Sequence, residues 1–141
     1  MRARVFISCG QARGTGEDTI ANEIVGRLRN LGFDPYVAVV EQTLRGLKEN
    51  IFAHLRTSEY FIFLDFKRDL IDATHSIHRG SLFSHQELAI AAFLEIEVLA
   101  LQEGGVKRDD GILPFVQANA IGFADRHTLH NVVADTVKER C

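Results

Sequence analysis

The sequence predicts a flavodoxin-like three-layer α/β sandwich, with helices on both sides of a central parallel five-stranded sheet. Short β-branched and aromatic runs alternate along the chain with amphipathic helical patterns, as successive βαβ units require. The run from Tyr60 to Leu64 is apolar without alternation, which is typical of a strand covered by helices on both faces. The length of 141 residues, with 46% hydrophobic and 25% charged residues, fits one domain spanning residues 1–141.

The first strand and the first helix have the clearest patterns. Val5 to Cys9 is a strand-like run that leads at Gly10 into a small, polar loop. From Asp18, a candidate N-cap, apolar residues recur at helical spacing until Gly32 ends the helix. These apolar residues are Ile20, Ile24, Leu28 and Leu31.

A second strand and a second helix precede the central strand. Phe33 to Val40 is strand-like, and Pro35 within it favours the start of a strand or an edge strand. Apolar residues at helical spacing then predict an amphipathic helix. They are Leu44, Leu47, Ile51 and Leu55. Tyr60 to Leu64 follows as the predicted central strand.

The second half of the chain has weaker patterns. Asp65 to Ser81 is polar and predicts a long loop with a short helical turn. A third helix is expected from about Ser84, which with Glu87 matches the Ser-x-x-Glu capping pattern. The remaining expected elements are strands at Val98–Leu101 and Ala120–Phe123, an exposed loop at Glu103–Asp110 and a last helix at Arg126–Lys138.

Charge and cysteine content exclude several functional classes. The formal net charge of -3 provides no electrostatic reason to expect nucleic acid or an anionic membrane as a partner. Cys9 and Cys141 are too few for a disulfide framework and favour a reducing compartment. No apolar run approaches the roughly 18 residues that cross a bilayer. We therefore expect a soluble, cytoplasmic protein.

Glu87 is the leading candidate for a catalytic residue. In doubly wound sheets, ligands bind outside the carboxyl ends of the strands, which selects the loops after Ile7 and Leu64 and the start of the third helix. A carboxylate there can stabilise or attack an oxocarbenium-like centre when an N-glycosidic bond breaks. The alternative is a structural capping-box role, in which the Glu87 side chain returns to the backbone of Ser84; the two roles are compatible.

Two short motifs resemble those of Toll/interleukin-1 receptor (TIR) domains. Val5-Phe6-Ile7-Ser8 resembles their first-strand box, and Ser84-His85-Gln86-Glu87-Leu88 resembles their Ser-x-x-Glu-Leu element. The resemblance covers roughly Arg4 to Leu101 and implies a prokaryotic-type TIR-like domain with the TIR fold. Many prokaryotic and plant members cleave the nicotinamide–ribose bond of NAD+, giving nicotinamide and ADP-ribose or a cyclic form. Their catalytic glutamate corresponds to Glu87.

The resemblance also implies the other site residues and the partners. Ser84 would line the site, and Tyr36 or Phe83 would stack on a ring of the substrate. The first-strand loop would contact nucleotide or ribose through Ser8, Cys9, Gly10 and Arg13. NAD+ would be the substrate, with no cofactor and no metal. We also expect self-association through TIR surfaces, a role in prokaryotic immune signalling, and further modules in a longer protein.

Several alternatives remain open. TIR domains include homotypic adaptors without catalysis. Nucleoside 2-deoxyribosyltransferases share the sheet order and also carry a helical glutamate before a small, Ala-rich face, as in Glu87-Leu88-Ala89-Ile90-Ala91. Asp65 resembles the acceptor of response-regulator receivers, but the acidic residues that hold magnesium after the first strand are missing. We therefore expect Asp65 to be a strand-end residue that accepts hydrogen bonds from a loop.

Overall fold

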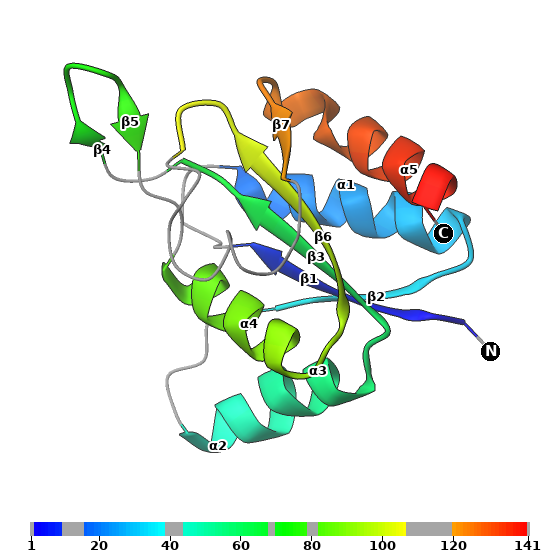
Figure 1. The fold of residues 1–141 in the computed structure, drawn as a ribbon. Helices are drawn as coiled ribbons and strands as arrows, with labels where there is room; N and C mark the ends of the chain where they lie inside the picture. The colour runs from blue at the N-terminus through cyan, green and yellow to red at the C-terminus, as the bar shows by residue number, and fades with distance from the viewer. Residues whose placement is uncertain are drawn as a thin grey trace.

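The computed structural model describes residues 2–9, 16–38, 44–67, 70–78, 82–106 and 120–140. Its centre is an all-parallel sheet of five strands in the order β2-β1-β3-β6-β7 (Figure 1). The strands are β1 (Arg4–Cys9), β2 (Asp34–Val37), β3 (Tyr60–Asp65), β6 (Glu97–Glu103) and β7 (Ile121–Phe123). This is the doubly wound, flavodoxin-like order, so the predicted fold class is confirmed. β3 is the central strand, and β2, which contains Pro35, lies at an edge as predicted.

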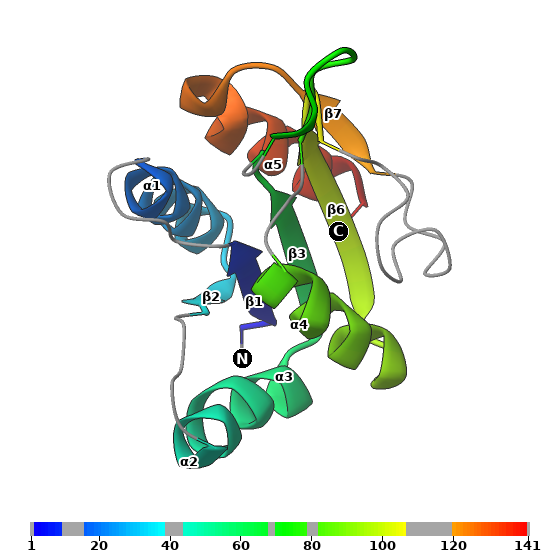
Figure 2. The same ribbon diagram turned by 90° about the vertical axis from the view of Figure 1, so that its left-hand side faces the viewer.

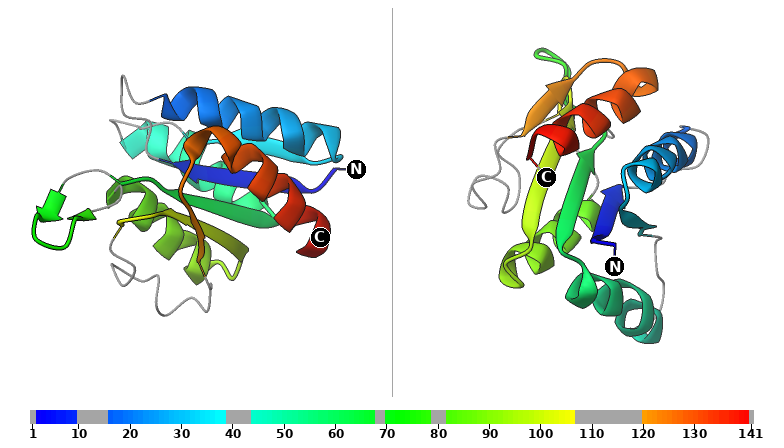
Figure 3. Two further views of the ribbon diagram at one scale, coloured as in Figure 1. Left: turned by 90° about the horizontal axis from the view of Figure 1, so that it is seen from above. Right: turned by 90° about the vertical axis from the view of Figure 1, so that its right-hand side faces the viewer.

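Helices cover both faces of the sheet (Figure 2). On one face lie α1 (Glu17–Asn30) and α5 (Leu129–Arg140). On the other lie α4 (Leu82–Phe93) and a second helical segment made of α2 (Leu44–Gly46), a π-helical stretch (Leu47–Phe52) and α3 (Ala53–Thr57). Both turned views in Figure 3 show the sheet between these two layers. Each layer buries its own apolar cluster against the sheet.

The residues along each strand alternate between the two clusters. Ile7 and Leu64 pack under α1 and α5, whereas Phe6, Phe63 and Ala100 pack on the side of α4. Because successive strand side chains point to opposite faces, this alternation fixes which face each residue at the carboxyl ends occupies. It places Ser8 on the α4 side, two residues after Phe6.

The start of the first helix differs from the prediction. The N-cap position belongs to Gly16, which has a φ of 74°, and no side chain caps the helix. Asp18 lies one residue inside α1 and is therefore not the N-cap. A positive φ is readily adopted by glycine, so Gly16 can begin the helix without a side-chain cap. Gly32, with a φ of 92°, follows the helix end as predicted.

The described part of the polar segment after β3 forms a hairpin where a helical turn was predicted. β4 (Leu70–Asp72) pairs antiparallel with β5 (Ile77–His78), and the hairpin projects beyond the sheet in Figure 1. The Asp72 carboxylate accepts hydrogen bonds from the backbone N–H groups of Thr74 and His75, which closes the turn. Hydrogen bonds to the side chain of Asp72 thus stabilise a hairpin turn where the polar composition suggested a helical turn.

Two further boundaries correct the sequence predictions. α4 begins at Leu82, so Ser84 lies within its first turn and is not its N-cap. β6 continues to Glu103, which is 7% exposed and not part of an exposed loop. The last helical region begins with a 3-10 turn (Arg126–Thr128), which is capped by Asp125 through the backbone N–H of His127. Residues 107–110 of the predicted loop lie outside the described residues.

Candidate active site

Ser8 and Glu87 meet at the carboxyl end of β1. Ser8 is fully buried on the α4 side of the sheet, and Glu87 is 2% exposed on α4. The Ser8 hydroxyl donates a short hydrogen bond to Glu87 Oε1, although the two residues are 79 positions apart in the chain. α4 packs on β1, β3 and β6, so it holds Glu87 over the middle of the sheet. The topology of a doubly wound sheet predicts ligand binding at this edge.

The second oxygen of Glu87 has no partner among the described residues. Within the described part of the chain, Oε2 is buried and accepts no hydrogen bond. Neither oxygen therefore returns to the backbone of Ser84, and the capping-box role expected for Glu87 is wrong. One oxygen is anchored and the other is left for another group.

The environment makes Glu87 a weak acid. Burial raises its pKa to about 8, and the hydrogen bond from Ser8 lowers it only in part. A carboxyl group whose pKa is this strongly shifted by burial is characteristic of functional sites, because the folded protein gains nothing from an ionised group there without a ligand.

A second polar pair lies on the same face, at the ends of β3 and β6. Asp65 and Gln102 are opposite each other in register, and Gln102 Nε2 donates to Asp65 Oδ2 at 2.8 Å. Asp65 is fully buried and Gln102 is 1% exposed. This partner of Asp65 is a strand side chain, and the expected hydrogen bond from a loop stays a prediction. Gln102 was missed by the sequence analysis, although a glutamine directly after the apolar run Val98–Leu101 was the available signal.

The opposite face carries a different cluster at the same edge. Glu103 accepts hydrogen bonds from the Lys67 backbone N–H at 2.9 Å and from Arg126 Nε and Nη2, both at 2.7 Å. The Arg126 guanidinium lies 4.7 Å from the ring centre of Phe66. The hydrogen bonds that Arg126 donates to Glu103 raise the pKa of Arg126, and the charges of Glu103 and of Glu17, which is fully buried at the start of α1, raise it further. The sequence analysis missed this cluster.

Among the other predicted site residues, the structure describes the side chains of Cys9 and Tyr36. Cys9 is buried in the apolar cluster under α1 and α5, so its side chain lies on the face opposite Glu87. The Tyr36 ring stacks on His54 with centroids 3.6 Å apart and also contacts Phe6. Phe83 and Ser84 lie in the first turn of α4, with side chains outside the described residues; Gly10 and Arg13 also lie outside them. Their roles stay predictions.

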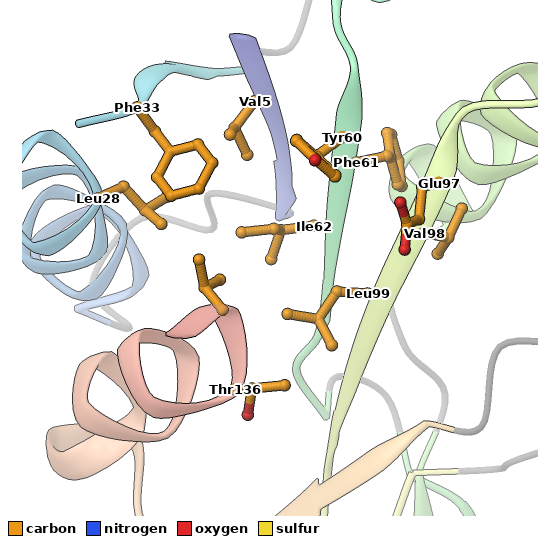
Figure 4. Close-up of a pocket in the computed structure, with 11 residues that line it drawn as sticks. Val5, Leu28, Phe33, Tyr60, Phe61, Ile62, Glu97, Val98, Leu99 and Thr136 are labelled. Carbon is orange, nitrogen blue, oxygen red and sulfur yellow. The ribbon is translucent and has the colours of Figure 1, made fainter. Parts of the chain in front are cut away.

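An apolar crevice lies at the other end of the sheet. Figure 4 shows it between α1, α5 and the amino ends of β1, β3 and β6, with about 30 Å³ of space for water. Val5, Tyr60 and Glu97, which line it, are paired in register at the starts of their strands. Four residues of strand separate Val5 from Cys9, or about 13 Å. This small apolar crevice is therefore remote from Glu87.

No group of three or more His, Cys, Asp or Glu side chains in the described ranges is arranged to hold a metal ion. None of the helices in those ranges is both long enough and apolar enough to cross a bilayer.

Comparison with known proteins reveals the fold alone. No protein family model matches the sequence, and no curated protein matches it. Among solved structures, the CMP N-glycosidase BcmB of Clostridium botulinum superposes with a TM-score of 0.64, at 11% identity over 98% of this chain and 99% of that one. The TIR domain heterodimer of RPS4 and RRS1 superposes with a TM-score of 0.66, at 11% identity over 99% and 97%. The chain therefore has a TIR-like fold.

Proposed function

We propose that this protein hydrolyses an N-glycosidic bond of a nucleotide, with NAD+ as the preferred substrate and Glu87 as the essential carboxylate. The observation that carries the proposal is the arrangement of Glu87: Ser8 anchors Oε1, and Oε2 is buried without a protein partner in the described residues. This arrangement suits a carboxylate that faces the anomeric carbon of a bound ribose.

The reaction balances without an acid or a metal. The C1′–N bond of NAD+ breaks, and its electron pair neutralises the pyridinium nitrogen, so nicotinamide leaves as a neutral molecule. Glu87 Oε2 stabilises the positive charge that develops at C1′ or bonds to that carbon transiently. Water then supplies a hydroxyl group to C1′ and releases a proton, giving ADP-ribose. Attack by a group of the substrate itself would give a cyclic product instead.

The charge of the substrate favours NAD+ over CMP. Because burial raises the pKa of Glu87 to about 8, the free site holds this carboxyl group mostly protonated at neutral pH. The permanent positive charge of a nicotinamide ring beside it favours the ionised form that the reaction needs. A neutral cytosine ring supplies no such charge. CMP, the substrate in the name of the similar N-glycosidase, is therefore the second candidate substrate, ahead of a deoxynucleoside undergoing base exchange.

A role in homotypic association is the second candidate function, and it is compatible with the first. Phe93 is 85% exposed and Leu94 is 37% exposed at the end of α4. They border an open surface cleft with Phe52, Arg56 and Ile90. The similar TIR domains form a heterodimer, and a prokaryotic TIR-like protein that associates in this way would fit a role in immune signalling. Loss of self-association in Phe93→Ser, measured by analytical ultracentrifugation, would support this function.

Incubation of the purified protein with NAD+ tests the reaction. Chromatography should detect nicotinamide together with ADP-ribose or its cyclic form, over a range of protein concentrations because assembly can complete such sites. Glu87→Gln should release nicotinamide roughly 10³-fold more slowly than the wild type, whereas Glu97→Gln, which changes an exposed glutamate at the start of β6, should match the wild type. CMP and deoxynucleosides are assayed in parallel. Absence of any N-glycosidic cleavage at high protein concentration, or cleavage by Glu87→Gln at the wild-type rate, would refute the proposed function.

A further inference from the structure

The proposed chemistry leaves the Asp65–Gln102 pair without a role. Both residues lie on the α4 side of the sheet, because Phe63 and Ala100, two positions earlier on the same strands, pack in the cluster beneath α4. Both are buried, with Gln102 only 1% exposed. The pair therefore shares its face of the sheet and its carboxyl edge with Ser8 and Glu87.

The hydrogen bond within the pair fixes the orientation of the Gln102 amide. Nε2 donates to Asp65 Oδ2 at 2.8 Å, and the reverse orientation would set two acceptors against each other, because a carboxylate only accepts. Gln102 Oε1 is left as a buried acceptor without a partner among the described residues. An unpaired buried acceptor is unfavourable, so a ligand that brings a donor to it is favoured.

The register of the sheet places this acceptor beside the proposed reaction centre. Ser8 pairs with Phe63, so Asp65 and Gln102 lie one side-chain step nearer the carboxyl edge. β1 and β6 flank β3, and their backbones are therefore about 10 Å apart. With a ribosyl carbon at Glu87 Oε2, a leaving group directed across the end of β3 would approach Gln102.

We infer that Asp65 and Gln102 form a leaving-group subsite, in which Gln102 Oε1 accepts a hydrogen bond from an N–H group of the departing ring. Gln102 determines specificity, and Asp65 is a positioning residue that holds the amide in its accepting orientation. In NAD+ the donor is the carboxamide NH2 group. The identity of the ligand rests on the proposed function, whereas the demand for a donor follows from the geometry of the pair.

The test compares NAD+ with 3-acetylpyridine adenine dinucleotide, which has the same charge but a methyl ketone in place of the carboxamide. The wild type should favour NAD+ in kcat/KM by at least roughly 10-fold, because the ketone leaves the Gln102 acceptor unpaired. Gln102→Met removes the acceptor, and Asp65→Asn allows the amide to turn round, so both should bring the ratio near one. Asp65→Asn is nearly isosteric and can still form a hydrogen bond, which protects the fold. Glu97→Gln, on the same strand as Gln102, should keep the wild-type ratio.

Binding of the same two dinucleotides to Glu87→Gln, measured by calorimetry, separates this inference from the proposed reaction. If NAD+ is hydrolysed but Gln102→Met keeps the wild-type ratio, the subsite is refuted and the proposed function stands. If nothing is hydrolysed but Glu87→Gln prefers NAD+, and the added change Gln102→Met abolishes that preference, the subsite stands and the reaction is refuted. Binding of neither dinucleotide, together with no hydrolysis, refutes both.

Discussion

Two glutamates near the carboxyl edge of the sheet, Glu87 and Glu103, are 2% and 7% exposed. Their pKa values are shifted in opposite directions. Glu87 receives one hydrogen bond, from the neutral hydroxyl of Ser8, and burial raises its pKa to about 8. Burial also acts to raise the pKa of Glu103, but the hydrogen bonds from Arg126 and the Lys67 backbone, with the charges of those residues, lower it overall. The two carboxyl groups lie on opposite faces of the sheet.

The difference separates a structural carboxylate from a candidate catalytic one. Glu103 has donors for both oxygens, so it stays ionised and joins β6, the chain after β3 and the last helical region. Glu87 has a spare oxygen and no cation beside it among the described residues, so its ionised form destabilises the folded state. A protein tolerates such a group where a ligand completes its environment.

The first prediction is a loss of catalysis when Glu87 is replaced. Glu87→Gln should lower N-glycosidic cleavage by roughly 10³-fold, because the amide can neither bond to the anomeric carbon nor stabilise its positive charge. Arg126→Met, which disturbs only the Glu103 cluster, should cleave near the wild-type rate at a temperature where it is folded. The measurement is nicotinamide release per folded molecule. Equal losses in the two variants would show that the two glutamates do not differ in role.

The second prediction is a loss of stability when Glu103 loses the cation that pairs with it. Arg126→Met should lower the free energy of unfolding by about 2–3 kcal/mol, because it leaves the Glu103 charge buried without its cation. This value lies below the range for fully buried pairs because the Arg126 side chain is 21% exposed. Arg126→Lys keeps the charge but loses the two-pronged geometry, so its loss should be intermediate. Urea denaturation measures all three proteins, and an unchanged midpoint for Arg126→Met would contradict the structural role.

The third effect is a pH dependence that belongs to Glu87 alone. Between pH 4.5 and about 8 the folded chain retains the Glu87 proton and the unfolded chain does not, so wild-type stability falls as pH rises. Glu87→Gln lacks this loss, and its stability relative to the wild type should therefore grow by about 2 kcal/mol from about pH 6 to about pH 7.5. The lowered pKa of Glu103 acts in the opposite sense and only at lower pH, where Glu103 becomes protonated. A constant difference between the two proteins would refute the raised pKa.

The fold was predictable because its signals are local. The apolar runs at Val5–Cys9 and Tyr60–Leu64 and the helical periodicity around them determine which segments bury which face, and the sheet order follows from βαβ connections. The sequence predictions were wrong where one local feature determined the structure and the composition of the segment did not. The Asp72 turn made a hairpin where polarity suggested a helical turn, and Gly16 began α1 through its backbone where Asp18 offered a side-chain cap.

The candidate site was predictable only where a motif singled out its residues. Ser8 and Glu87 were both named from motifs, but nothing in the sequence indicated that they hydrogen-bond to each other across 79 positions. Gln102 and Arg126 belong to no motif, and their importance depends on register and on partners from other elements. Pairings of this kind require the assembled sheet, because strand alternation decides which face each polar end residue occupies.

The last prediction concerns the hydrogen bond that Ser8 donates to Glu87. Ser8→Ala should slow cleavage roughly 10-fold, because a hydrogen bond to a charged group contributes about 1.5–3 kcal/mol and burial of Glu87 is otherwise unchanged. The Ser8 hydroxyl lowers the pKa of Glu87, so its removal raises that pKa further, and the rise of kcat/KM with pH should move to higher pH in the variant. Ser8→Thr keeps the hydroxyl and should restore the wild-type pH profile even if its added methyl group slows the reaction. A slower Ser8→Ala enzyme with an unshifted pH profile would mean that Ser8 only fills space beside Glu87 and does not lower its pKa.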